Sequence, residues 1–348
     1  MPREEEIEGP GGLEEQGALQ TEALRPYAHA ELVACDGCLR GNAPTRLSCL
    51  YCGAALPATS QGAALRRPVL KKVEEWEQGF NVILLPRVVW PAAPEAAEEA
   101  AALLRLDAGR LKEVVDSGLA LPLARVSTPE EAELIVERLG ALGFGAEVLA
   151  DEALAAAPLR ARALGFDADA LVCMNSPDSE PRRVPWAEVT LLVRGRIVSR
   201  RVEVAERRRG LAGRSEMVDA REIVSDEAVL DVYAAEGEAG LRVLSGGFDY
   251  SCLGPGKGLL ASENFVTLVG ELRARAPGAV YDEEYSRLRP LLADAWPPAE
   301  RTESLGLRRE GTGRVNTEAV TKVSNELQFT RYARLRHLQV SRTRTGSL

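Results

Sequence analysis

Four cysteines near the N-terminus are the residues whose type and spacing most clearly predict chemistry. Cys35 and Cys38 form one CxxC pair, and Cys49 and Cys52 form a second pair after ten intervening residues. A CxxC segment can bend into a tight turn that aims both sulfur atoms at one point, and two such turns can enclose a tetrahedral site. Four thiolates in that geometry suit Zn²⁺. The cysteines therefore predict one bound zinc ion.

The cysteine pattern resembles that of the zinc-ribbon family, which implies a small metal-stabilised fold. Gly53 follows the second pair, where backbone N–H groups approach sulfur and a bulky side chain would intrude. A site with four protein ligands has no open position for water or substrate, so the zinc is expected to be structural. Two structural disulfides between the same cysteines are the alternative interpretation.

The rest of the chain offers few residues for catalysis. It contains two histidines, His29 and His337, whereas most hydrolytic triads and catalytic zinc sites depend on histidine. Cys173 and Cys252 lie in apolar, strand-like surroundings, which favours buried core residues over nucleophiles. We therefore predict no catalytic residue, no cofactor other than zinc and no enzymatic activity. An enzyme that uses one of these two thiols is the alternative.

The overall composition is that of a globular protein with an acidic balance. The chain has 348 residues, of which 45% are hydrophobic and 27% charged, and its formal net charge is −9. No apolar run approaches the roughly 20 residues of a transmembrane helix, and the N-terminus is acidic where a secretory signal would be basic and then apolar. We therefore predict a cytoplasmic protein.

Nucleic-acid binding by so acidic a chain would require local basic patches, and two segments could supply them. One is the loop of the ribbon, where Asn42 and Thr45 accompany two arginines. The other is the C-terminal segment, which has no acidic residue from position 331 onward. The possible nucleic-acid contacts are Arg40, Arg46, Arg331, Arg334 and Arg336. A solvated or partly docked tail is the alternative for the C-terminal group.

Changes in composition along the chain predict a multidomain α+β protein. The predicted parts are an acidic disordered segment (1–30), the zinc ribbon (31–56), a linker (57–79), a β-α-α-β-α-β domain (80–151), an antiparallel barrel with a C-terminal helix (158–278), and a helix followed by a basic segment (279–348). The oligomeric state is not predicted.

The second organised part contains the strongest helix signal, TPEEAELIVERLGALG. Thr128 is placed to cap this helix, Pro129 to occupy its first position, and Glu131 to complete a capping box. Ala132, Ile135, Leu139 and Leu142 lie on one apolar face of it. Three segments read as strands, namely FNVILLP (80–86), LALPLARV (119–126) and FGAEVLAD (144–151).

Three segments of this part, FNVILL, LKEVVD and VSTPEEAELIVERLGALGFGAEV, resemble the C-terminal domain of the bacterial ribosomal stalk protein over residues 80–151. That family recruits translational GTPases through basic residues on its two middle helices. Only Arg110 and Lys112 remain near that surface, and residues 98–104 are apolar and acidic. The resemblance therefore implies the fold more than the GTPase binding.

The next part reads as several antiparallel strands followed by one helix. Arg194–Gly195 is a turn signal, and AERRRGLAGRSE is expected to be a loop insertion. In the helix, Ser262 is placed to cap, and the face that repeats at helical spacing consists of Phe265, Leu268, Val269 and Leu272. Trp186 and Trp296 are expected to be core residues.

The VPWAEV strand and the NFVTLVGELRARAP helix resemble a bacterial pleckstrin-homology-like domain over residues 158–278. In that family the helix closes the open end of a bent sheet, and the domains bind peptides, lipid head groups or proteins. Because each recognisable part is of an interaction type, we predict a non-enzymatic zinc-binding adaptor or scaffold for other macromolecules, chiefly proteins. A nucleic-acid- or ribosome-associated factor is the alternative.

Overall fold

A computed structural model describes residues 27–28, 31–57, 68–86, 93–175, 180–208, 215–235, 240–311 and 314–345. The chain divides into two compact units, Met1–Arg67 and Pro68–Leu348. The first unit contains the cysteine cluster, and the second contains small sheets, a curled half-barrel sheet and a C-terminal helix packed on that sheet. The prediction of a mixed α+β fold is confirmed at this level.

The described part of the first unit is a two-stranded sheet beside the cysteine cluster, and we call its residues 31–57 the ribbon. Strands β1 (Val33–Ala34) and β2 (Gly41–Asn42) pair antiparallel, and Ser48 bridges to Ala55. Its buried apolar residues are Val33, Cys35, Cys49 and Leu56. So small a core does not normally fold unaided, because domains this short need a metal, disulfides or association. A metal held by the cysteine cluster would therefore contribute much of the stability of residues 31–57.

The second unit begins with the predicted alternation of strands and helices. Its first elements are β3 (Phe80–Leu84), α2 (Pro94–Leu104), α3 (Ala108–Asp116), β4 (Pro122–Val126), α4 (Pro129–Ala141) and β5 (Ala146–Ala150). The three strands form an antiparallel sheet in the order β4-β3-β5. Ala132, Ile135 and Leu139 of α4 are fully buried, so the apolar face predicted for this helix does point into the core.

At the N-terminus of α4, one predicted capping contact is present and the other is replaced by a different contact. Thr128 caps the helix as predicted, because its hydroxyl accepts a hydrogen bond from the N–H of Glu131 at 3.3 Å. The Glu131 carboxylate does not complete the capping box. It accepts hydrogen bonds from the N–H groups of Val69 and Leu70 at 2.6 and 2.7 Å, and the residue is buried. Glu131 therefore anchors the segment that leads into β3.

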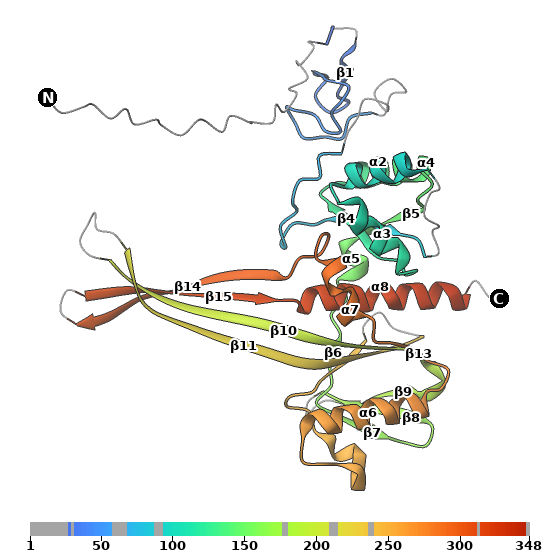
Figure 1. Cartoon of the computed structure of the whole chain (residues 1–348), viewed down its shortest axis with the longest axis vertical. Helices are drawn as coiled ribbons and strands as arrows, with labels where there is room; N and C mark the ends of the chain where they lie inside the picture. Colours follow the sequence, from blue (N-terminus) through green and yellow to red (C-terminus); the bar gives the residue numbers. More distant parts are fainter. Residues whose placement is uncertain are drawn as a thin grey trace, which may run out of the picture. The chain divides into compact units, whose positions relative to one another are not determined.

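A larger sheet crosses the second unit and curls into a half-barrel (Figure 1). Its strands are β6 (Leu159–Arg160), β10 (Val189–Arg208), β11 (Ser215–Ala234), β12 (Leu241–Leu244), β13 (Val280–Asp282), β14 (Ala299–Gly311) and β15 (Arg314–Ser324). The order is β14-β15-β10-β11-β12-β6, and β13 pairs parallel with β10. The remaining short elements are α5 (Asp151–Leu154), η2 (Trp186–Glu188), η3 (Tyr250–Gly256) and α7 (Tyr285–Leu292).

Two predictions for β10 and β11 are wrong. Gly195 lies within β10 and not in a turn. A Cβ atom at this position would lie 2.5 Å from the ring of Phe329. The glycine is needed for the close approach of that ring. The described residues of the predicted loop insertion, 205–208 and 215–216, are strand, since β10 continues to Arg208 and β11 starts at Ser215. Residues 209–214 lie outside the described residues.

The half-barrel sheet is covered on both faces where it crosses the body of the unit. One face carries α8 (Glu326–Thr345), and the buried residues Leu191, Val193 and Ile197 of β10 belong to the cluster on that side. The other face packs on a small sheet and on α6 (Ala261–Arg275) (Figure 1). The small sheet consists of β7 (Ala163–Phe166), β8 (Ala170–Met174) and β9 (Arg182–Pro185). This part of the half-barrel sheet, which we call the body, therefore lies between two other layers.

The predicted amphipathic helix exists as α6, with Phe265, Leu268, Val269 and Leu272 buried as expected. Ser262 does not cap it, because the helix starts at Ala261 and Ser262 is its second residue. Two helices pack on the half-barrel sheet, α6 on one face and α8 on the other, and α8 comes from the segment predicted as a basic tail. The sheet also draws β14 and β15 from that segment, so it extends beyond the predicted barrel of 158–278.

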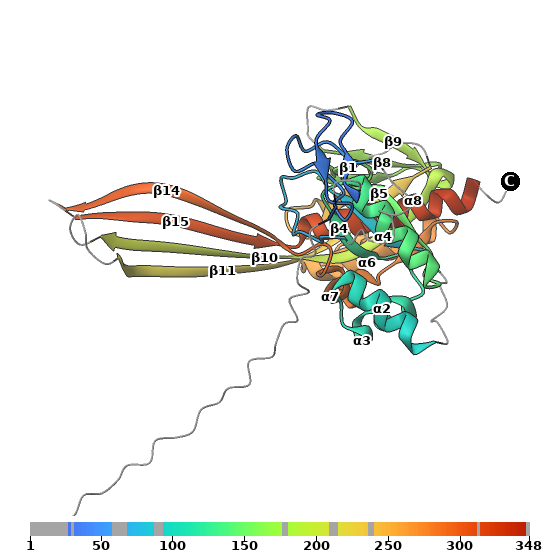
Figure 2. The same cartoon turned by 90° about the horizontal axis from the view of Figure 1, so that it is seen from above.

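The outer parts of four strands project from the rest of the second unit as a four-stranded sheet (Figures 1 and 2). We call this sheet the arm and define it as residues 200–208, 215–224, 300–311 and 314–323. Several large apolar side chains on it are exposed, namely Met217, Ile223, Val224 and Leu305. The arm therefore presents apolar surface that the body does not cover.

Candidate functional site

The four predicted metal ligands come together in the first unit. One ligand atom from each of Cys35, Cys38, Cys49 and Cys52 lies within 4.8 Å of all the others, and none of the four forms a disulfide. The closest sulfur pairs, Cys35 with Cys52 and Cys38 with Cys49, are 3.5 Å apart. Tetrahedral zinc with Zn–S bonds of about 2.3 Å requires sulfur atoms about 3.8 Å apart. The cluster could therefore hold one metal ion, and zinc fits it best.

Local hydrogen bonds prepare this cluster for a cation. Burial opposes ionisation of Cys49, but the N–H groups of Cys52 and Tyr51 and the amide of Asn42 lower its pKa to about 6. The N–H of Arg40 favours ionisation of Cys38, but desolvation and the other three thiols raise its pKa to about 12. Cys49 therefore ionises readily while Cys38 resists ionisation, because neighbouring thiolates repel each other. A bound cation would offset this repulsion.

Asn42 is a residue of this site that the sequence analysis placed wrongly, as an exposed loop residue. Its side chain is buried and links the two cysteine turns. The amide oxygen accepts from the N–H of Leu50 at 2.8 Å, and the amide nitrogen donates to the carbonyl of Arg40 at 2.9 Å and to the sulfur of Cys49 at 3.4 Å. Asn42 therefore orients the metal ligands without being a ligand itself.

An Asn42→Ala variant is expected to bind zinc about ten- to a hundredfold more weakly. The substitution removes the hydrogen bonds that connect the two cysteine turns, including the donor to the sulfur of Cys49. Competition with a chromophoric chelator would measure the affinity. Thr45→Ala, at a half-buried position of the same loop, is the matched control and should change the affinity little. Equal affinities for the two variants would contradict a positioning role for Asn42.

The other two ribbon residues predicted as nucleic-acid contacts, Arg40 and Arg46, are exposed. The guanidinium of Arg40 lies over the ring of Tyr51, 4.7 Å from its centroid. The Nε–H of Arg46 donates to the carbonyl of Ser48 at 3.2 Å. Both side chains therefore remain accessible at the surface of the first unit.

The three arginines predicted as contacts in the C-terminal segment lie on α8 and have internal partners. Arg331 is buried and lies 3.5 Å from the carboxylate of Asp151. Arg334 is buried and donates to the carbonyl of Ala153 at 3.1 Å. Arg336 pairs with Asp282 at 2.6 Å. These guanidinium groups hold α8 in place, so few of their N–H donors remain available to bind phosphates.

The two lone cysteines and His337 are all in the second unit. Burial raises the pKa of Cys173 to about 11 and also raises that of Cys252, so both thiols stay protonated near neutral pH. His337 is buried and stacks on Tyr233 with ring centroids 4.6 Å apart. Burial and the charge of Arg334 lower the pKa of His337 to about 4. The structure places no histidine in contact with either thiol among the described residues.

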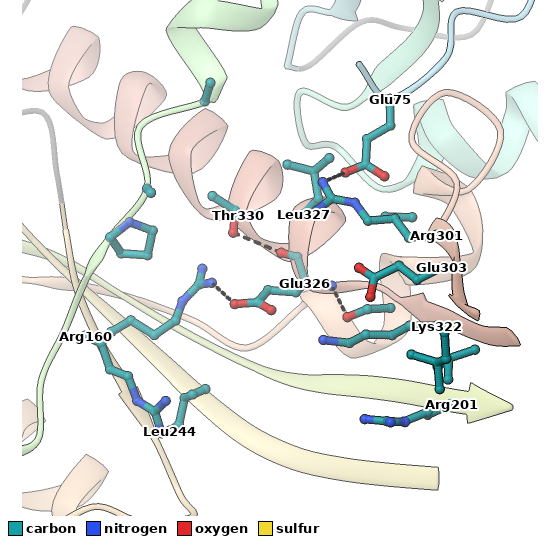
Figure 3. A pocket seen from close by; sticks show the side chains of 18 residues that line it. Glu75, Arg160, Arg201, Leu244, Arg301, Glu303, Lys322, Glu326, Leu327 and Thr330 are labelled. Carbon is teal, nitrogen blue, oxygen red and sulfur yellow. Dashed lines mark hydrogen bonds and ion pairs between the residues drawn. The ribbon is translucent and has the colours of Figure 1, made fainter. Parts of the chain in front are cut away.

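A pocket of about 610 Å³ lies in the second unit where the base of the arm meets the start of α8 (Figure 3). Charged side chains of both signs line it. Arg301 pairs with Glu75 at 2.6 Å, and Arg242 lies 3.5 Å from Glu326 and 2.7 Å from the buried Asp231. Because most of these charges are already paired within the protein, the pocket favours neither an anionic nor a cationic ligand.

No known protein family, curated protein or solved structure matches the chain. The resemblances to the zinc ribbon, the ribosomal stalk domain and the pleckstrin-homology-like domain therefore depend on the residues quoted above. None of the described helices has the length and apolar character that a bilayer-crossing segment needs.

Proposed function

We propose that the protein is a non-enzymatic zinc-binding adaptor whose ribbon docks on other proteins. The observation that carries this proposal is the exposure of three large apolar side chains beside the cysteines. Leu39 is 82% exposed, Leu50 64% and Tyr51 54%. The ribbon has a very small core, yet it leaves these residues in water. Exposed apolar side chains on a rigid turn are typical of protein-binding surfaces.

The backbone at Leu39 supports the same proposal. Leu39 has a φ of +59°, in the left-handed region that residues with a Cβ atom rarely adopt. Its N–H donates to the carbonyl of Cys35 at 2.7 Å, so the metal turn fixes this conformation. A glycine would relieve the strain, whereas leucine adds an exposed apolar side chain. Strained residues that persist in this way often mark functional sites.

The remaining parts fit an adaptor in a less specific way. The β-α-α-β-α-β order of residues 80–151 supports the resemblance to the ribosomal stalk domain. The curled half-barrel supports a distant resemblance to pleckstrin-homology-like sheets, although its strands reach beyond residue 278. Both families bind other macromolecules, but fold alone does not identify a partner.

The test compares proteins captured from a native lysate by the tagged full-length chain and by a Leu50→Asp variant, with and without nuclease. We expect a defined set of proteins that survives nuclease and is lost in the variant. Leu259→Asp is the matched control, because Leu259 is a fully exposed leucine of the second unit. Zinc content must be equal in all three samples. A captured set that the Leu50→Asp change leaves intact would contradict the proposal.

Nucleic-acid binding is the alternative outcome of this experiment. The exposed Arg40 and Arg46 favour it, and binding would then disappear with nuclease and fall steeply as salt rises. An Arg40→Ala, Arg46→Ala double variant would weaken it. Alanine substitutions at Arg334 or Arg336 are less suitable, because they remove internal partners of α8.

A further inference from the structure

The two faces of the arm differ strongly in chemistry. In an antiparallel sheet, directly paired residues point to the same face, so the strand registers assign each side chain. Arg200 pairs with Val224 and Val323, and Arg201 pairs with Ile223 and Lys322. The apolar members of the first face, which we call the valine face, are Val202, Val204, Ala220, Val224, Ala319 and Val323.

The second face, which we call the charged face, has a different composition. Its charged members are Arg201, Glu203, Arg221, Arg301, Glu303 and Lys322. It continues the side of β10 that carries Gly195 and Ile197, which lies against α8 in the body. The exposed Ile223 also lies on this face, but ionic side chains predominate, so the charged face is suited to water.

The valine face continues the other side of the sheet. Within the body that side carries Leu192 and Leu230, which pack with α6 and the β7–β9 sheet. Beyond Val198 no described element of residues 68–348 covers it (Figures 1 and 2), and Val224 is 60% exposed. A sheet with one apolar face normally buries that face against another layer.

We propose that the valine face packs against the valine face of a second copy of this chain. The first reason is charge. The ionic groups on this side of β10 and β11 neutralise each other within one copy, because Arg200 pairs with Glu222 at 2.7 Å and Arg196 with Asp226 at 2.8 Å. Glu300 of the edge strand β14 adds one carboxylate to this face, because it pairs in register with Val323. The net charge of each face is therefore small, and a two-fold axis brings the same patch of each copy together.

The second reason is size. The arm is four strands wide, or about 19 Å, and residues 198–204 of β10 span about 23 Å. Two such faces in contact would bury on the order of 1,000 Å², which is the lower limit for a specific protein interface. Small and β-branched side chains allow two sheets to approach to about 10 Å. The interaction is therefore expected to be a modest, concentration-dependent dimer. It does not depend on the ribbon or on the proposed adaptor function.

Sedimentation velocity of the zinc-loaded full chain over a range of concentrations tests this proposal. We expect a monomer–dimer equilibrium for the wild type and at least about tenfold weaker association for Val224→Glu, which would bring two carboxylates into the dimer interface. Val224→Glu should fold, because the residue is exposed and the new carboxylate lies beside Arg200. Ile223→Glu is the matched control, because it adds the same charge at the neighbouring residue on the charged face.

The Ile223→Glu variant should associate as the wild type does, within about twofold. Thr302→Glu, on the exposed edge strand of the valine face, provides a second variant and should weaken association like Val224→Glu. A wild type that remains monomeric at about 100 μM, which corresponds to a free energy of association weaker than about −5.5 kcal/mol, would overturn the proposal. If all variants associated as strongly as the wild type, the proposal would also be overturned, since the dimer contact would then lie outside the valine face.

Discussion

A Cys49→Ser variant is expected to bind no stoichiometric zinc and to lose the fold of residues 31–57, while residues 68–348 stay folded. Cys49 is buried and belongs to the small core of the ribbon. A serine hydroxyl does not ionise near neutral pH, so the site would lose one of its four anionic ligands. Structural zinc contributes about 10–16 kcal/mol of apparent binding free energy in small zinc domains, and the ribbon has few other stabilising contacts.

Metal analysis would measure the zinc, and amide hydrogen exchange would report the fold of each unit. Cys252→Ser is the matched control, because it removes a half-buried thiol from the second unit and should leave one zinc per chain. Unfolding of residues 31–57 by a reductant but not by a chelator would support the disulfide alternative. One tightly bound zinc in the Cys49→Ser variant would show that the four-thiolate site is incorrect.

The cysteine cluster could be predicted because its information is local. Each CxxC pair forms one turn, so spacing alone brings Cys35 to Cys38 and Cys49 to Cys52. The residue that connects the turns could not be predicted in the same way. Asn42 reads as a polar loop residue, and its burial follows only from the meeting of both turns. Glu131 is a similar case, because its partners lie more than sixty positions away.

The fold of residues 80–151 was also predictable from local signals. Thr128 and Pro129 mark the start of α4, and the apolar residues of that helix repeat at helical spacing. The predicted order of strands and helices is confirmed there. The signals were strong because each element carries its own cap or its own apolar pattern.

The C-terminal segment is where the structure differs most from the prediction, and the reason is physical. Its arginine-rich part, which forms α8, predicts a solvated or partly docked tail when it is seen alone. In the structure Arg331 pairs with Asp151 and Arg336 with Asp282, and both carboxylates come from distant parts of the chain. Gly195 misled the strand prediction for a similar reason, because the ring that requires a glycine there belongs to α8. Long-range partners of this kind leave no pattern in the sequence.

Trp296 is where these distant parts meet, and a Trp296→Ala variant is expected to lower the free energy of unfolding of the second unit by about 4 kcal/mol. The indole is fully buried, and its N–H donates to the amide oxygen of Asn81 on β3 at 2.7 Å. Gln328 of α8 donates to the carbonyl of Trp296 at 2.7 Å. Alanine would leave a large cavity and a buried amide oxygen without its donor.

Urea unfolding followed by circular dichroism would measure this change, and Trp296→Phe would divide it into two parts. Phenylalanine retains most of the packing and removes only the donor to Asn81, so a loss of about 1–3 kcal/mol is expected. One continuous core joins β3, α4, α7 and α8, so the elements on both sides of Trp296 should unfold in a single transition. A Trp296→Ala loss below about 1 kcal/mol would contradict this junction. Separate unfolding of residues 80–151 would show that they form an independent domain, because the shared core would then contribute little to cooperativity.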